Sequence, residues 1–125
     1  MVEHPSPTEI AVAFTEAWTG HDMSTAESYL AEEVVYDGPV NHVVGVRGYV
    51  EALERFARAV TGLEIIAVLG DEEQAMIMYE VSTGRFGTLT CGEHLTVRSG
   101  KIQTDRLAFD TYAIRMAQAG GAASD

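Results

Sequence analysis

The sequence predicts an α+β domain in which a curved antiparallel sheet forms a cone-shaped barrel packed against three N-terminal helices. Two observations predict it. Apolar residues recur at helical spacing before residue 60, whereas β-branched runs separated by turn residues follow residue 62. A block of helices followed by hairpin strands is typical of helices packed on one face of an antiparallel sheet. If the sheet bends around the helices, the two layers enclose a cavity suited to a small ligand.

Three segments are expected to be helical: residues 8–20, 24–30 and 49–60. Thr8 is the expected N-cap of the first, and His21-Asp22 is expected to end it and to cap the second. Apolar residues gather on one side of the first and third helices. These inward positions are Ile10, Phe14, Ala17 and Trp18, then Val50, Leu53, Phe56, Ala57 and Val60.

Five segments are expected to be strands. A short one at 33–37 ends at Gly38-Pro39 and is followed by a loop over 40–48. The other four form a meander whose last two members are joined by a tight turn at Ser99-Gly100. Their ranges are 63–69, 75–83, 87–98 and 101–112.

The length of 125 residues fits one domain, and 46% apolar with 22% charged residues is ordinary for a globular protein. We divide the chain into a flexible N-terminus (1–7), a single domain (8–115) and a disordered tail (116–125) that lacks packing side chains. The net charge of −11 disfavours nucleic acid and anionic membranes as partners. Cys91 is the only cysteine, and no signal or membrane segment is apparent, so we expect a cytoplasmic protein.

The sequence also carries a family resemblance. Its motifs are the run Ala-Trp-x-x-His-Asp at 17–22, the segment 30–39 (Leu-Ala-Glu-Glu-Val-Val-Tyr-Asp-Gly-Pro), a glycine before the third helix, and Gly-Lys-Ile at 100–102. Over about residues 8–113 the chain resembles the nuclear transport factor 2-like superfamily, in its SnoaL-like and ketosteroid isomerase-like branch. The resemblance implies a cone-shaped sheet, a homodimer or higher oligomer, and an apolar pocket closed by the first and third helices. Activities in that superfamily include ketosteroid isomerisation, polyketide cyclisation, epoxide hydrolysis and dehydration, and other members only bind or associate.

The resemblance also implies candidate site residues. The tyrosine that donates a hydrogen bond in ketosteroid isomerases corresponds to Phe14, and the acid of a late strand corresponds to Glu93. The catalytic aspartate corresponds to Gly38, so that a one-residue shift brings Asp37 into its place. The aspartate of SnoaL-like cyclases corresponds to Leu107, with Asp105 one inward position earlier. The arginine of the epoxide hydrolases has no counterpart, because Arg98 and Arg106 fall on the opposite strand faces.

Strand alternation supports two of these carboxylates independently. Glu93 shares a strand face with Leu95 and Val97, so its carboxyl group would be desolvated and able to donate a proton. The alternative is a strand twist or bulge that turns Glu93 to solvent, or a hydrogen bond to a neighbouring hydroxyl. Asp105 shares a face with Leu107 and Phe109, and with Glu93 it would divide acid and base roles. Its alternative is a solvated side chain paired with Arg98 or Lys101.

Two further side chains are candidates near the short strand. Tyr36 has the alternation of Val34 and Gly38, so its hydroxyl would replace the absent helix tyrosine, unless it is simply a core aromatic with its hydroxyl at the rim. His42 lies in the loop expected to cover the pocket mouth and would act as a base or remain a surface histidine.

Two functions follow. The first is a cofactor-independent isomerase, cyclase or dehydratase acting on a small apolar carbonyl compound, with Asp37 or Asp105 as base and Glu93 with Tyr36 polarising the oxygen. The second is a non-catalytic ligand-binding or dimeric association module. For a ligand pocket, the substrate-binding side chains would be Phe14, Trp18, His42, Phe56, Leu107 and Phe109. For the association module, the cone would instead be filled by Phe14, Trp18, Phe56, Leu107 and Phe109.

The histidines and Cys91 lack metal-ligand spacing, and we expect neither a metal nor a cofactor. Apolar residues on both faces of 75–83 (Met76, Ile77, Met78, Tyr79 and Val81) suggest a sheet buried on two sides, and His94 would lie on the outer face. Both features are those of a homodimer.

Overall fold

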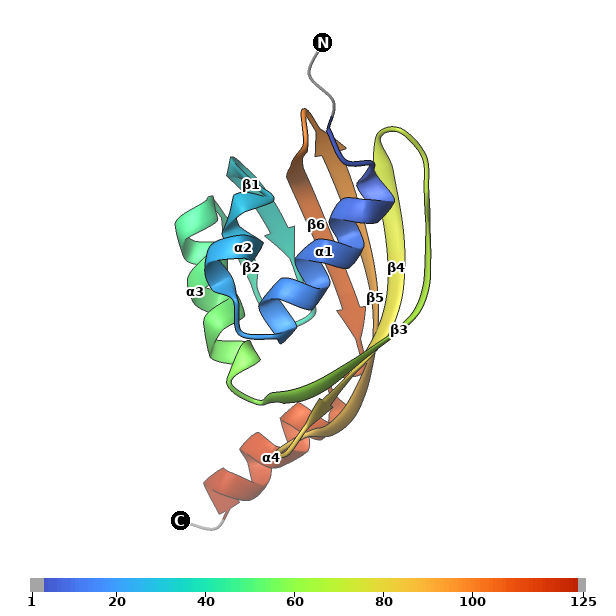
Figure 1. The fold of residues 1–125 in the computed structure, drawn as a ribbon. Helices are drawn as coiled ribbons and strands as arrows, with labels where there is room; N and C mark the ends of the chain where they lie inside the picture. The colour runs from blue at the N-terminus through green and yellow to red at the C-terminus, as the bar shows by residue number, and fades with distance from the viewer. Residues whose placement is uncertain (1–3, 124–125) are drawn as a thin grey trace.

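The computed structural model describes residues 4–123. Four helices and six strands follow one another in the order of Figure 1. The helices are α1 (Pro7–Thr19), α2 (Met23–Ser28), α3 (Val46–Ala57) and α4 (Tyr112–Ala123). The strands are β1 (Leu30–Asp37), β2 (His42–Val44), β3 (Val60–Gly70), β4 (Gln74–Thr83), β5 (Gly87–Arg98) and β6 (Lys101–Phe109).

A single curved sheet holds all six strands, in the order β2-β1-β6-β5-β4-β3. The predicted meander is confirmed, because β3 to β6 pair antiparallel with their neighbours in sequence. The sheet is mixed rather than wholly antiparallel, since β1 lies parallel to β6. It stays open, with β2 at one edge and β3 at the other. In Figure 1, α1, α2 and α3 cover one face, so the α+β architecture is confirmed.

The helix at the N-terminus begins earlier than predicted. Ser6, not Thr8, is its N-cap: the Ser6 hydroxyl accepts a hydrogen bond from the Glu9 amide, and the Glu9 carboxylate accepts one from the Ser6 amide at 2.9 Å. This reciprocal pair is a capping box, and Pro7 takes the first helical position, where its missing N–H costs nothing. Residues 1–3 of the expected flexible N-terminus lie outside the described residues.

Besides shifts of a few residues at other element ends, the structure differs from the sequence prediction in the expected loop and in the expected tail. Residues 42–44 of the predicted loop form β2, which pairs antiparallel with the end of β1. Helix α4 occupies most of the segment expected to be a disordered tail from Met116, where alanine, the strongest helix former, is frequent. Figure 1 shows α4 extending beyond the end of β6, away from the other helices. Among residues 4–123, no helix is long and apolar enough to span a membrane.

The two faces of the sheet differ as strand alternation predicts. Ile77, Tyr79 and Val81 of β4 are buried under the helices, while Met76 and Met78 are 56% and 47% exposed on the outer face. On that face the His94 ring lies beside Gln74, with 2.8 Å between Nε2 and the amide oxygen. The homodimer expected through this surface stays a prediction.

Candidate functional site

A pocket of about 270 Å³ lies between α1, α3 and the inner face of the sheet. Its volume is close to the lower end of the range for ligand sites, roughly 300–1,000 Å³. The walls are mainly aromatic and aliphatic, and four polar side chains reach it from three strands and one helix. The apolar wall includes Trp18, Leu53, Phe56, Phe86, Leu107 and Phe109; the polar residues of the interior are Tyr36, Tyr49, Tyr79 and Glu93.

Two carboxyl groups are buried together on the inner face. Glu93 of β5 is 3% exposed and Asp105 of β6 is 1% exposed. Glu93 is opposite Leu107 and Asp105 is opposite Leu95, so the two acids are diagonal neighbours on adjacent strands. Burial, and secondly the charge of Glu93, raises the pKa of Asp105 well above its usual value. Burial and this neighbouring acid therefore both favour the protonated form of Asp105.

Two tyrosines hold these carboxyl groups. The Tyr79 hydroxyl donates to Glu93 Oε1 at 2.7 Å, and the Tyr49 hydroxyl donates to Asp105 Oδ2. Both phenols are fully buried, and desolvation followed by the neighbouring carboxylates raises their pKa values well above 10. They therefore remain protonated donors. Asp105 Oδ1 is buried without a partner among the described residues, which further favours the neutral form of Asp105.

A third tyrosine hydroxyl reaches the pocket from β1. The Tyr36 ring stacks on Tyr49, with centroids 4.6 Å apart and planes 17° from parallel. Burial raises its pKa, so it too is a donor. The ring folds over Gly38, where an added Cβ would collide with the Tyr36 hydroxyl and ring. Tyr49 and Tyr79 already donate to carboxyl groups, whereas the Tyr36 hydroxyl and the buried Trp18 Nε1, which has no partner among the described residues, are left as donors for a ligand.

The structure brings most of the predicted site residues together. Glu93 and Tyr36 line the pocket with Trp18, Phe56, Leu107 and Phe109. Asp105 lies behind Glu93, and Phe14 packs behind Tyr49 with ring centroids 6.2 Å apart. The solvent-facing alternatives for Glu93 and Asp105 do not occur, but the other alternative for Glu93, a hydrogen bond to a neighbouring hydroxyl, does, with Tyr79 as the donor. The cavity is also not filled by its aromatic walls, as the association-module hypothesis would require.

Asp37 and His42 lie apart from this cluster, at the end of the β1–β2 pair. Their side chains are 46% and 59% exposed, and His42 Nδ1 is 2.5 Å from Asp37 Oδ1. Neither belongs to the pocket lining, although the intervening Val40 and Asn41 do. A part for Asp37 in catalysis and for His42 in binding stays a prediction. Across residues 4–123, no three His, Cys, Asp or Glu side chains gather as a metal site.

Sequence reasoning missed Tyr49 and Tyr79. Tyr79 carried a usable signal, because it alternates with Ile77 and Val81 on β4 and is paired with Cys91, two residues before Glu93. Tyr49 carried a weaker one: it belongs to the buried side of α3, but only the rotation of that helix over the sheet brings its hydroxyl to Asp105.

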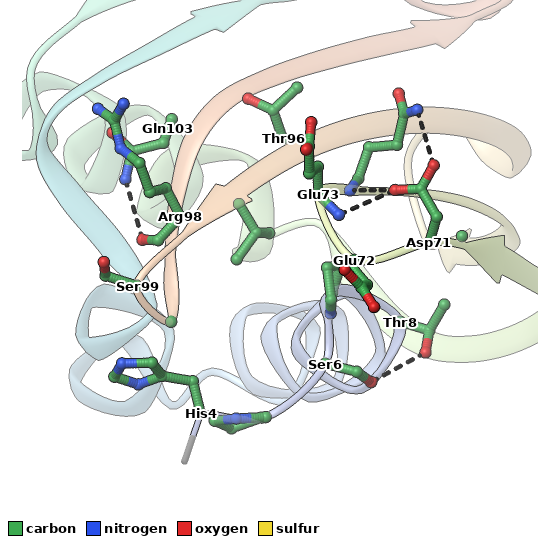
Figure 2. A pocket seen from close by; sticks show the side chains of 16 residues that line it. His4, Ser6, Thr8, Asp71, Glu72, Glu73, Thr96, Arg98, Ser99 and Gln103 are labelled. Atoms are coloured by element: carbon green, nitrogen blue, oxygen red, sulfur yellow. Dashed lines mark hydrogen bonds between the residues drawn. The ribbon is translucent and has the colours of Figure 1, made fainter. Parts of the chain in front are cut away.

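A second, larger hollow of about 1,060 Å³ opens between the N-terminal segment, the β3–β4 turn and the β5–β6 hairpin. Figure 2 shows its labelled side chains, which include His4, Asp71, Glu73 and Arg98. These four are exposed, and Asp71 is occupied within its own turn, where it accepts hydrogen bonds from the amides of Glu73 and Gln74. Those bonds lower the pKa of Asp71. The hollow is wide and polar, and the buried acids lie elsewhere, so the smaller pocket is the candidate active site.

Comparison with known proteins agrees with this geometry. The sequence model of the SnoaL-like domain matches residues 11–104. A crystal structure of a protein from Kribbella flavida DSM 17836 is similar with a TM-score of 0.88 and 30% identity, over 92% of this chain and 95% of that one. No curated protein matches the sequence.

Two more distant structures share the fold. An NTF2-like protein of unknown function from Cytophaga hutchinsonii ATCC 33406 has a TM-score of 0.77 and 15% identity, over 92% of this chain and 99% of that one. A LEH-like epoxide hydrolase of M. tuberculosis has a TM-score of 0.73 and 20% identity, over 94% and 92%. Arg98 and Arg106, the arginines considered for hydrolase chemistry, are exposed here.

Proposed function

The chain belongs to the SnoaL-like family, and from this membership and its pocket we propose a cofactor-independent acid–base enzyme acting on a small apolar carbonyl compound. Isomerisation, cyclisation and dehydration can all begin with the same step, removal of a proton next to a carbonyl group. The observation that carries the proposal is Glu93, a buried carboxyl group facing an otherwise apolar pocket. Burial of an acid in such a position destabilises the fold, and it is typical of a functional site.

The proposed roles follow from which side chains reach the cavity. Burial favours the protonated form of Asp105, which lies outside the pocket lining, and we assign Glu93, which lines the pocket, as the base. Glu93 takes a proton from the carbon beside the carbonyl, and the electron pair of that C–H bond moves to the carbonyl oxygen. The Tyr36 hydroxyl donates a hydrogen bond to this developing oxyanion. Return of the proton to a different carbon gives an isomer with no net change in charge or oxidation state.

Asp105 differs here from its role in the sequence-based hypothesis, where it was one of two candidate bases. It is separated from the pocket lining, and the Tyr49 hydroxyl holds one of its oxygens. In the proposal it is a positioning residue that lies beside Glu93 on the neighbouring strand. The apolar walls keep water from solvating the carboxylate, which strengthens both the base and the hydrogen bond to the oxyanion.

The test is proton exchange, because this first step can be followed whatever the final product is. The protein is incubated in D₂O with 2-tetralone or cyclohex-3-enone, and deuterium incorporation next to the carbonyl is followed by NMR. We expect Glu93→Gln to slow protein-dependent exchange by about 100-fold or more, the usual contribution of a general base. Glu32→Gln, at an exposed position of β1, is the matched control and retains the wild-type rate.

Two results would contradict the proposal. One is exchange that continues undiminished in Glu93→Gln. The other is binding of these ketones in the pocket, seen as a chemical-shift change, without any exchange above the protein-free rate. The second result would favour the non-catalytic ligand-binding function.

A further inference from the structure

We infer that the compound bound in this pocket carries a carboxylate, which Arg55 binds at the pocket mouth. The inference rests on the proposed function and names its substrate class: an apolar oxo acid with its carbonyl group near Glu93 and its anionic end near solvent. It comes from the distribution of charge along the pocket.

Arg55 is the cationic residue of the pocket lining. It lies in the last turn of α3 with an exposed side chain, and the next residue, Phe56, belongs to the aromatic wall. The Phe56 ring lies 5.9 Å from that of Trp18 and 6.2 Å from that of Phe109, centroid to centroid. A ligand held against these rings therefore has Arg55 beside its outer end.

A second guanidinium group lies near the same wall. Arg85 sits over the ring of Phe86, with 5.2 Å from its Cζ to the ring centroid, and Phe86 also lines the pocket. This arrangement brings a cation from the β4–β5 turn to the wall that already carries one from α3. Arg55 and Arg85 thus both lie beside an aromatic residue of the pocket wall, although the chain has a net charge of −11.

The acids around the pocket leave Arg55 available. Asp37 is paired with His42, the one ion pair found among residues 4–123. Glu51 and Glu54 of α3 are exposed, and neither forms an ion pair with Arg55 at contact distance within the described chain. Glu93 is at the inner end, where it would repel a carboxylate. A ligand with one anionic end is thus oriented in one direction only, with its carboxylate outward.

Guanidinium chemistry suits this role. Arginine is always protonated and can hold a carboxylate through two parallel hydrogen bonds. At an exposed mouth such a contact is screened by salt, so we expect about a fivefold effect on affinity rather than a decisive one.

The experiment compares two probes of nearly the same shape, 4-phenylbutanoate and its neutral amide, 4-phenylbutanamide. Trp18 is the only tryptophan of the chain and forms part of the pocket wall, so its fluorescence reports binding directly. At low ionic strength we expect the carboxylate to bind about fivefold more tightly than the amide. Arg55→Gln should remove this difference, and added salt should reduce it in the wild type.

Arg58→Gln is the matched control. Arg58 is the C-cap of the same helix and lies outside the pocket lining, so its removal takes an equal charge from the same helix end. The preference for the carboxylate should survive in this variant. If the preference for the carboxylate is lost equally in Arg58→Gln, it arises from the overall positive charge at this end of the helix. The inference about Arg55 would then be wrong.

The remaining outcomes separate this inference from the proposed function. Equal affinities of the wild type for the two probes would overturn the carboxylate inference alone and leave the acid–base chemistry of Glu93 untouched. Exchange that does not depend on Glu93, together with an intact carboxylate preference, would overturn the enzyme and keep the anion site. Absence of any fluorescence or thermal response to either probe would overturn the carboxylate inference, and absence of exchange in the same protein would then overturn the enzyme as well.

Discussion

The sheet carries two pairs of side chains that contain an acid, and in both the two members lie on adjacent strands. The pairs differ in their exposure to solvent and in the free-energy cost of ionisation. Asp37 and His42 meet at the open end of β1 and β2, with about half of each side chain in solvent. Glu93 and Asp105 meet in the middle of the sheet, beneath the helices, and are almost wholly buried. Solvent screens the first pair, so that it contributes at most about 1 kcal/mol to stability. The second cannot ionise fully without a large desolvation cost.

The difference shows that position in the sheet, rather than residue type, determines how far a carboxyl group is buried. Both pairs are formed by residues on neighbouring strands. The exposed pair joins β1 to the edge strand β2, which is only three residues long. The strands of the buried pair are central, and each has a further strand beyond it. The predictions below alter one pair while the other serves as the reference.

Asp105→Asn is expected to have the largest effect on stability, and the effect depends on pH. The folded pKa of Asp105 is raised, so the native state binds more protons than the unfolded state above the unfolded pKa of about 3.8. The contribution of Asp105 to the free energy of unfolding of the wild type is therefore fully present below that pH. It is lost as the pH rises toward the folded pKa. The slope for one proton is about 1.4 kcal/mol per pH unit.

An asparagine at this position keeps the shape of the aspartic acid but does not titrate. The Asp105→Asn variant should therefore lack this slope and exceed the wild type in stability at the alkaline end. Urea unfolding at a series of pH values measures the free energy of unfolding of both proteins. Parallel pH profiles of the wild type and Asp105→Asn would show that Asp105 ionises freely in the folded protein, contrary to this account.

Tyr49→Phe is expected to be next in size. It removes the hydroxyl that donates to Asp105 Oδ2. Asp105 Oδ1 already has no partner among the described residues, so this buried carboxyl group loses the donor to its other oxygen. The expected loss is about 1–3 kcal/mol of unfolding free energy, measured by chemical denaturation. Tyr112→Phe, at an exposed tyrosine, is the control and should stay within about 0.5 kcal/mol of the wild type. A Tyr49→Phe protein as stable as this control would mean that the bond to Asp105 contributes nothing.

Asp37→Asn is expected to have the smallest effect. Its half-exposed carboxylate contributes about 0–1 kcal/mol through His42, and the deuterium exchange rate should fall by less than about threefold. This variant also decides the sequence-based hypothesis that Asp37 is the base. If Asp37→Asn lost as much exchange as Glu93→Gln, the base would belong to the exposed pair. The assignment of Glu93 as the base would then be wrong.

The sequence predicted the buried pair better than its surroundings, for a physical reason. Alternation along β5 and β6 depends only on local geometry, so it placed Glu93 and Asp105 on the inner face correctly. The hydrogen bond from Tyr49 joins residues 56 positions apart and depends on how α3 sits over the sheet, which no local pattern specifies. The same holds for the parallel pairing of β1 with β6.

The predicted ends of helices and strands were wrong where two local sequence patterns favoured different structures. Thr8 and Ser6 are both good caps, and the glutamate three residues after Ser6 decided between them. The segment 40–48 contains turn residues that suggested a loop, yet His42–Val44 forms a strand because the edge of β1 offers it hydrogen-bond partners.

The parallel pairing of β1 with β6 also determines when the site can exist during synthesis. Leu30 is aligned with Ile102, and Tyr36 with Asp105. Strand β1 is therefore synthesised early but cannot pair with β6 until the last strand is available. Until residue 109 at the end of β6 has left the ribosome, β1 has only the short β2 beside it, and β5 has one edge without a partner strand. Such long-range pairings form slowly, because the chain between them must be ordered first. The carboxyl pair of Glu93 and Asp105 therefore forms only when the final strand docks.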